Sequence, residues 1–187
     1  MGNLTNGEPA MWKHVAIFVA TLGAFGFSIM MMSQVIGFSS PWMVLMLFFC
    51  FLGLAKVAEP IYMLELPASL RRLRPWELRG GIYAKLGVGG FGALLRNTPL
   101  RLANTKVYVS KERRDPFVIC RQVASAEAIH FWGAFVLLPY LALCLWFGKW
   151  SVLAAFLAIQ VVGNAYPMMH LRSVRARLER ISRRAAR

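Results

Sequence analysis

The sequence predicts an all-α integral membrane protein with four transmembrane helices, arranged as two hairpins joined by a basic interfacial segment. Hydrophobic residues make up 58% of the 187 residues and charged residues only 16%, whereas soluble domains are about half apolar and about a quarter charged. The formal net charge is +14, and its distribution is uneven. Of 22 Lys and Arg residues, twelve lie between Arg71 and Arg121 and seven between Arg172 and Arg187, beside apolar segments. This pattern is typical of a membrane protein with basic cytoplasmic regions.

Four apolar segments predict the membrane-spanning helices. They cover residues 15–36, 42–57, 128–147 and 151–169. Each is about long enough to cross a hydrocarbon core of ~30 Å, although the second is short and requires a thinner bilayer. Short turns at residues 38–41 and 148–150 separate the members of each pair.

The distribution of Lys and Arg predicts the topology. Basic residues accumulate on the cytoplasmic side of membrane proteins, so both termini and the long middle region are expected there, with the two short turns outside. We therefore expect an N-terminal transmembrane hairpin (residues 1–58), a basic cytoplasmic or interfacial segment (59–127), a C-terminal transmembrane hairpin (128–171) and a basic tail (172–187).

The middle segment is expected to be a partly embedded platform on the membrane surface. Residues 61–73 have apolar residues near helical spacing followed by arginines, which predicts an interfacial amphipathic helix that Pro67 kinks or restarts. Residues 102–109 are compatible with a short strand or an extended run. Because the arginines adjoin membrane segments, their expected partners are anionic lipid head groups, and nucleic acid is not expected.

A candidate site lies where the third apolar segment begins. Glu127 and His130 are three residues apart, so on a helix they share a face. If Ala128 is level with about His170 in the antiparallel neighbour, Asn164 lies about one turn deeper than His130. His130 held by Glu127 would act as a general base, and Asn164 would orient the imidazole or stabilise an oxyanion. His170 is expected at the rim.

Two other interpretations of this pair stay open. Glu127 would pair with an arginine such as Arg121, leaving His130 to bond a helix partner. Alternatively, a Glu-x-x-His pair binds metal in some helical bundles, and the protein would be a metal-dependent lipid enzyme. The second carboxylate pair of such sites is missing from this sequence, so no metal site is assigned.

A second cluster of candidate residues is basic and aromatic. Its members are Trp76, Glu77, Tyr83 and Lys85, within a glycine-containing stretch. Lysine and neighbouring arginines would hold a phosphate or carboxylate, and glycines permit close backbone approach. The alternative is an interfacial turn anchored by its aromatic rings. Arg172 and Arg175 are either lipid anchors or contacts to an anionic substrate.

The same residues carry a resemblance to a known family. Over about residues 75–178 the chain resembles the glycosyl-4,4'-diaponeurosporenoate acyltransferase family of small bacterial membrane proteins. Three stretches carry the resemblance: Trp76-Glu77-x-x-Gly80-x-x-Tyr83-x-Lys85; Ala126-Glu127-x-x-His130 with a following aromatic residue; and Asn164 and Pro167 followed by Arg172-x-x-Arg175-x-Arg177-Leu178.

The resemblance implies an enzyme of the bacterial cytoplasmic membrane that moves a fatty acyl group onto a hydroxyl of a glycosylated carotenoid or other lipid. His130 would then be the general base. No cofactor is expected beyond an acyl donor such as acyl-CoA as co-substrate, and the expected partners are membrane lipids and a lipid or glycolipid substrate. The alternative is a non-catalytic membrane subunit or lipid-binding scaffold of a larger complex, with a protein partner or a homo-oligomer left open.

Overall fold

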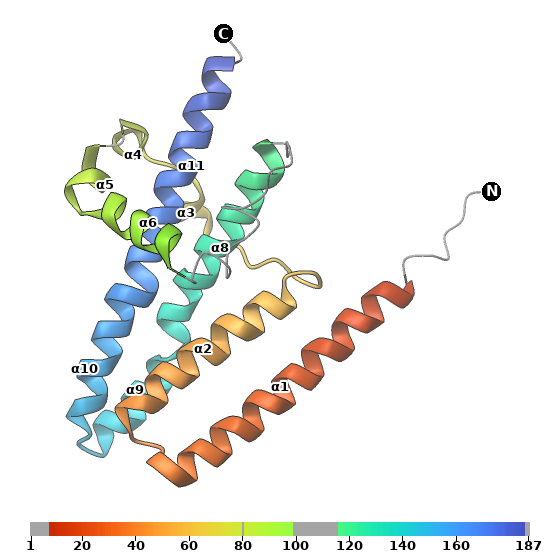
Figure 1. Cartoon of the computed structure of the whole chain (residues 1–187), viewed down its shortest axis with the longest axis vertical. Coiled ribbons are helices and arrows are strands. Elements are labelled where there is room, and N and C mark those ends of the chain that lie inside the picture. Colours follow the sequence, from red (N-terminus) through yellow and green to blue (C-terminus); the bar gives the residue numbers. More distant parts are fainter. Residues whose placement is uncertain (1–7, 80, 99–115, 186–187) are drawn as a thin grey trace. The chain divides into compact units, whose positions relative to one another are not determined.

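A computed structural model describes residues 8–79, 81–98 and 116–185. In these ranges every regular element is helical (Figure 1). Four helical stretches there are long and apolar enough to cross a membrane: Met11–Ile36, Pro41–Ala58, Val118–Trp146 and Trp150–Arg184. The predicted all-α membrane class with four spans is therefore confirmed. The hairpin arrangement, the cytoplasmic termini and the division into four segments stay predictions.

The chain forms two compact units, each built from two stretches of sequence. The first unit contains Met1–Leu64 and Trp132–Val161, and the second contains Glu65–Phe131 and Val162–Arg187. The first unit holds most of the apolar helix, and the second holds the basic segment together with the candidate site residues.

In the first unit, α1 (Glu8–Ile36) and α2 (Pro41–Ala58) pack against each other. The turn between them needs Gly37 at a φ of 82°, a conformation that glycine adopts without steric cost. The Ser40 side chain then accepts a hydrogen bond from the Trp42 N–H, and Pro41 occupies the first helical turn. Such a cap and such a proline both favour helix initiation.

The core of the first unit lies where α2 meets α9 (Leu138–Trp146) and α10 (Trp150–Ile159). Its buried residues are Met43, Val44, Phe48, Leu137, Tyr140, Leu141, Cys144, Val152 and Phe156. The Tyr140 hydroxyl donates to the Phe38 carbonyl at 2.7 Å. This bond satisfies the one polar atom of a buried ring and ties α9 to the turn after α1.

In the second unit, four short helices lead toward a long basic one. They are α3 (Ala68–Arg71), α4 (Pro75–Arg79), α5 (Gly81–Lys85) and α6 (Val88–Asn97), and α4 to α6 pack against α11 (Tyr166–Ala185) (Figure 1). The unit also contains the first part of α8 (Pro116–Val136). The stretch Trp150–Arg184 has 35 residues, more than the about 20 that one crossing needs, so we expect its arginine-rich end to lie outside the hydrocarbon core.

The predicted amphipathic helix over residues 61–73 is wrong for most of its length. Residues 62–67 are not helical, and a single turn of helix, α3, follows Pro67. A proline disfavours helical geometry at the preceding residue and donates no N–H, so Pro67 starts a helix here rather than kinking one. The strand or extended run considered for residues 102–109 lies outside the described residues.

A π-helical segment, Gln160–Ala165, separates α10 from α11. It contains Asn164, and Pro167 follows in the first turn of α11. A proline at position 167 cannot donate to the carbonyl four residues earlier, which belongs to Gly163. Single-turn π segments are frequent at functional sites because they redirect side chains and backbone groups out of the regular helical pattern.

Candidate functional site

Glu127 lies at the centre of a buried ionic network in the second unit. Its side chain is fully buried, and both carboxylate oxygens are engaged by guanidinium groups. Arg172 donates from Nη1 to Oε1 at 2.6 Å, and Arg175 donates to Oε2. Since Arg172 and Arg175 are three residues apart on α11, they present one face of that helix to α8.

Glu77, on α4, is the second carboxylate of the network. It accepts hydrogen bonds from the Arg172 side chain, from the Arg74 backbone N–H at 2.6 Å and from the Tyr83 hydroxyl at 2.6 Å. Burial acts to raise the pKa of Glu77, but the hydrogen bonds from Arg172, Arg74 and Tyr83 outweigh it, so the pKa lies below its ordinary value. Burial and the bond to Glu77 raise the pKa of Tyr83, which keeps the phenol protonated.

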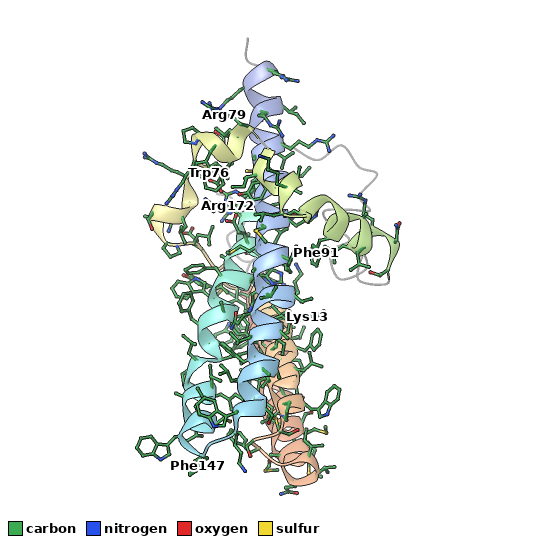
Figure 2. The ribbon with its side chains drawn as sticks, turned by 90° about the vertical axis from the view of Figure 1, so that its left-hand side faces the viewer. Lys13, Trp76, Arg79, Phe91, Phe147 and Arg172 are labelled. Carbon is green, nitrogen blue, oxygen red and sulfur yellow. The ribbon has the colours of Figure 1, made fainter. Side chains whose placement is uncertain are left out.

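Other donors of the two guanidinium groups reach backbone carbonyls of the segment before α4, whereas Nε of Arg175 has no partner among the described residues. Arg172 donates to Leu70 at 2.9 Å and to Arg72 at 3.3 Å, and Arg175 donates to Arg71 at 2.6 Å. Figure 2 shows Arg172 on α11 beside the part of the chain that carries Trp76. Two carboxylates and two guanidinium groups balance in charge, and the network joins α4, α8 and α11.

His130, one turn after Glu127 on α8, contacts the π-helical segment. Its imidazole interacts with the Asn164 side chain and with the backbone of Gly163, the residue whose carbonyl Pro167 leaves without its helical donor. Nδ1 of His130 is buried and has no hydrogen-bond partner among the described residues. The residue as a whole is of intermediate exposure.

His170 lies on a different face of α11, against α6. Its side chain is buried, and its ring centroid is 6.3 Å from that of Phe91. Gly92 is required at this contact, because a Cβ there would lie 2.6 Å from Cε1 of His170. Figure 2 shows Phe91 on α6 alongside α11.

Next to this contact the second unit has a cavity of about 510 Å³. Polar and charged side chains share its wall with small apolar residues. The lining residues are Glu77, Tyr83, Ala84, Val88, Gly89, Gly92, Arg96, His170, Ser173, Val174, Ala176, Arg177 and Arg180. The cavity therefore adjoins the ionic network through Glu77 and Tyr83.

The structure brings together most of the residues that the sequence predicted for the site, but with different partners. Glu127 bonds to Arg172 and Arg175 rather than to Arg121 or His130. His130 contacts Asn164, which the assumed register had placed about one turn deeper than His130.

Two predicted substrate-binding residues lie apart from these contacts. Trp76 is 45% exposed, with its ring centroid 6.4 Å from that of Tyr83, and Lys85 is exposed without an ion pair to a described carboxylate. In the part of the chain that the structure describes, no three His, Cys, Asp or Glu side chains gather in a way that would hold a metal ion.

Sequence reasoning missed the cavity-lining residues of α6 and the far end of α11, namely Arg96, Gly92, Ser173 and Arg180. A signal for part of this set was present. A spacing of three or four residues places side chains on one face of a helix. This spacing holds for residues 170, 173, 177 and 180, so they share a face that does not include Arg172 and Arg175. Nothing in the sequence pairs that face with α6.

The fold and the site define a class: a four-span, all-helical membrane protein with a buried carboxylate–guanidinium network beside a basic cavity. A family model for glycosyl-4,4'-diaponeurosporenoate acyltransferase matches residues 67–184. The chain belongs to this family, which confirms the resemblance. Neither a comparison with curated proteins nor one with solved structures finds a match.

Proposed function

We propose that this protein transfers a fatty acyl group onto a hydroxyl of a glycosylated carotenoid or a related lipid, with His130 as the general base. Family membership over residues 67–184 supports the reaction type. The observation that carries the role of His130 is its imidazole, set beside Asn164 and the Gly163 backbone with Nδ1 left without a partner among the described residues. An imidazole oriented by a neighbouring carbonyl is suited to accept a proton from a hydroxyl.

The proposed reaction is an acyl exchange. The acceptor hydroxyl oxygen attacks the acyl carbonyl of a thioester donor such as acyl-CoA while its proton passes to His130. The carbon–sulfur bond then breaks, and the leaving thiolate takes the proton from the imidazolium. The Asn164 amide is a donor that can stabilise the oxyanion of the tetrahedral intermediate. The proposed location is a bacterial cytoplasmic membrane.

Glu127 serves this reaction as a positioning residue. Both of its oxygens are engaged by Arg172 and Arg175, so it holds α8 against α11 one turn from His130. This arrangement fixes the separation of His130 and Asn164, which lie on these two stretches of helix. Small errors in such positions are costly because catalysis depends on the orientation of reacting groups.

The second candidate function is a non-catalytic, lipid-binding scaffold. The ion pairs of Glu127 favour it, because they give the most deeply buried carboxylate a structural task. A scaffold would hold lipid without turning it over, alone or as a subunit of a larger complex.

An acyl-transfer assay separates these functions. The purified protein in neutral micelles is incubated with palmitoyl-CoA and glycosyl-4,4'-diaponeurosporenoate, and the acylated product is measured by mass spectrometry. Because a general base contributes about 10²- to 10⁴-fold, His130→Gln should lower the initial rate at least ~100-fold. The matched control is His14→Gln, in the first unit, which should retain the wild-type rate.

Wild-type rates in the folded His130→Gln protein would remove His130 from the mechanism. A wild-type protein that binds both substrates but forms no product would support the scaffold instead. Folding of each variant is checked by circular dichroism and by its melting temperature.

A further inference from the structure

The cavity in the second unit lies between one face of α11 and one face of α6. On α11, the lining positions His170, Ser173, Arg177 and Arg180 repeat every three or four residues. On α6, Gly89, Gly92 and Arg96 do the same. Residues at this spacing share a helix face, so the two faces meet across the cavity.

Three arginines line this cavity without a carboxylate to neutralise them. Arg96, Arg177 and Arg180 form no ion pair with any carboxylate whose side chain the structure describes. The carboxylate in the lining is Glu77, which is already bound to Arg172. Arg96 is close enough to act electrostatically on His170. Three like charges around one hollow repel each other, so an anion that enters the cavity relieves the repulsion.

Besides the charged residues and Tyr83, His170 and Ser173, the lining is small and apolar. Short apolar side chains come from Ala84, Val88, Val174 and Ala176, and two glycines, Gly89 and Gly92, add no side chain. A volume of about 510 Å³ falls within the range of ligand pockets, about 300–1,000 Å³. Arginine recognises phosphate oxygens through its planar fork of donors. The lining therefore suits a phosphate ester that carries an apolar portion.

We propose that this cavity binds the phosphate ester of an amphiphile, with Arg96, Arg177 and Arg180 contacting the phosphate oxygens. The inference rests on the proposed function, since it assigns a place to the anionic part of the acyl donor. Two sources supply this chemistry: the nucleotide portion of an acyl-CoA and the head group of an anionic phospholipid. Arg172 and Arg175, on the other face of α11, are not part of the site, because they do not line the cavity and are already bound to Glu77 and Glu127.

Direct binding tests the site without requiring turnover. Full-length protein in neutral maltoside micelles is titrated with coenzyme A, with palmitoyl-CoA and with phosphatidylglycerol, and the dissociation constants are measured by calorimetry. The triple variant Arg96→Gln, Arg177→Gln, Arg180→Gln should weaken binding of the preferred probe at least tenfold. The single variant Arg180→Gln should weaken binding of the same probe by a smaller factor. This variant keeps the test usable if the triple variant does not fold.

A matched control separates the cavity from the general positive charge of the protein. Arg79→Gln, Arg183→Gln, Arg184→Gln removes the same charge from exposed arginines that do not line the cavity, and it should keep the wild-type affinity. Binding of coenzyme A that competes with palmitoyl-CoA supports the nucleotide source. Binding of phosphatidylglycerol alone supports the head-group source.

The proposed site is contradicted if the two triple variants weaken probe binding equally, or if no probe binds to the wild-type protein. The His130→Gln variant keeps this result separate from the proposed reaction. If that variant binds palmitoyl-CoA normally and loses acyl transfer, both proposals stand. If it binds normally and retains transfer, the role of His130 fails while the anion site stands.

Discussion

The two arginine faces of α11 differ in how their charge is balanced. Arg172 and Arg175 are mostly buried and bind two carboxylates and three backbone carbonyls. Arg177 and Arg180 are exposed, line the cavity and have no carboxylate partner among the described side chains. The difference teaches that arginines on one helix act as structural links where buried carboxylates lie opposite them. Where none of the described carboxylates does, the arginines carry the proposed ligand site.

Removing a carboxylate from the balanced face should have the largest effect. Glu127→Gln leaves Arg172 and Arg175 buried without their shared counter-charge, and breaking a buried pair in this way costs about 3–5 kcal/mol. Thermal unfolding in micelles should show this loss. In Glu179→Gln, which breaks an exposed pair with Arg183, the loss should be about 0.3–0.5 kcal/mol. Equal losses in the two variants would contradict the contrast between buried and exposed charge.

The contact beside the cavity allows a second test. Gly92→Ala would place a Cβ 2.6 Å from Cε1 of His170 and 2.9 Å from its Nδ1, and such overpacking costs about 1–3 kcal/mol. Gly90→Ala is the matched control on α6, because its Cβ meets nothing within 4 Å. That substitution should stabilise the helix by about 0.5–1 kcal/mol. Similar melting temperatures for both variants would show that α6 does not pack against His170.

Acid should weaken the balanced face through Glu77. Its pKa is below the ordinary value of 4.5, so the folded state gains stability from the carboxylate above about pH 4.5 and loses it as the pH falls through the lower, folded-state pKa. Tyr83→Phe removes one hydrogen bond to the carboxylate, which should cost about 1.5 kcal/mol at pH 7 and move the acid loss to higher pH. The control Tyr62→Phe, at an exposed position, should change neither the stability at pH 7 nor the pH at which stability is lost. Melting curves between pH 7 and pH 3.5 measure both effects, and an unchanged acid profile in Tyr83→Phe would contradict them.

The smallest effect on stability is expected on the unbalanced face. Arg177→Gln and Arg180→Gln each remove a charge that pairs with no described carboxylate, so the unfolding free energy should change by less than about 0.5 kcal/mol. Arg175→Gln, which leaves Glu127 short of a partner, serves as the comparison and should cost several times more. A loss in Arg177→Gln as large as that in Arg175→Gln would erase the distinction between the two faces.

The sequence predicted the candidate site in part. The assumed antiparallel register placed Asn164 about one turn deeper than His130, because helix geometry sets which residues of neighbouring helices are level, and the structure brings the two side chains into contact. The register was not enough to give Glu127 its partners. Arg121, six residues before Glu127 on the same helix, was as eligible as Arg172, and the choice depends on side-chain reach across the packed helices. Pro67 was expected to kink or restart a helix, and the structure shows that a short helix starts after it.

The sequence by itself determined the membrane class, the four spans and the family. These depend on composition, apolar length and short motifs, which are local properties of the chain. Only the tertiary structure decided which arginines are neutralised and which remain for a ligand. That outcome depends on contacts between α4, α6, α8 and α11, whose residues are distant in sequence, and on the strong distance dependence of electrostatic and hydrogen-bond interactions.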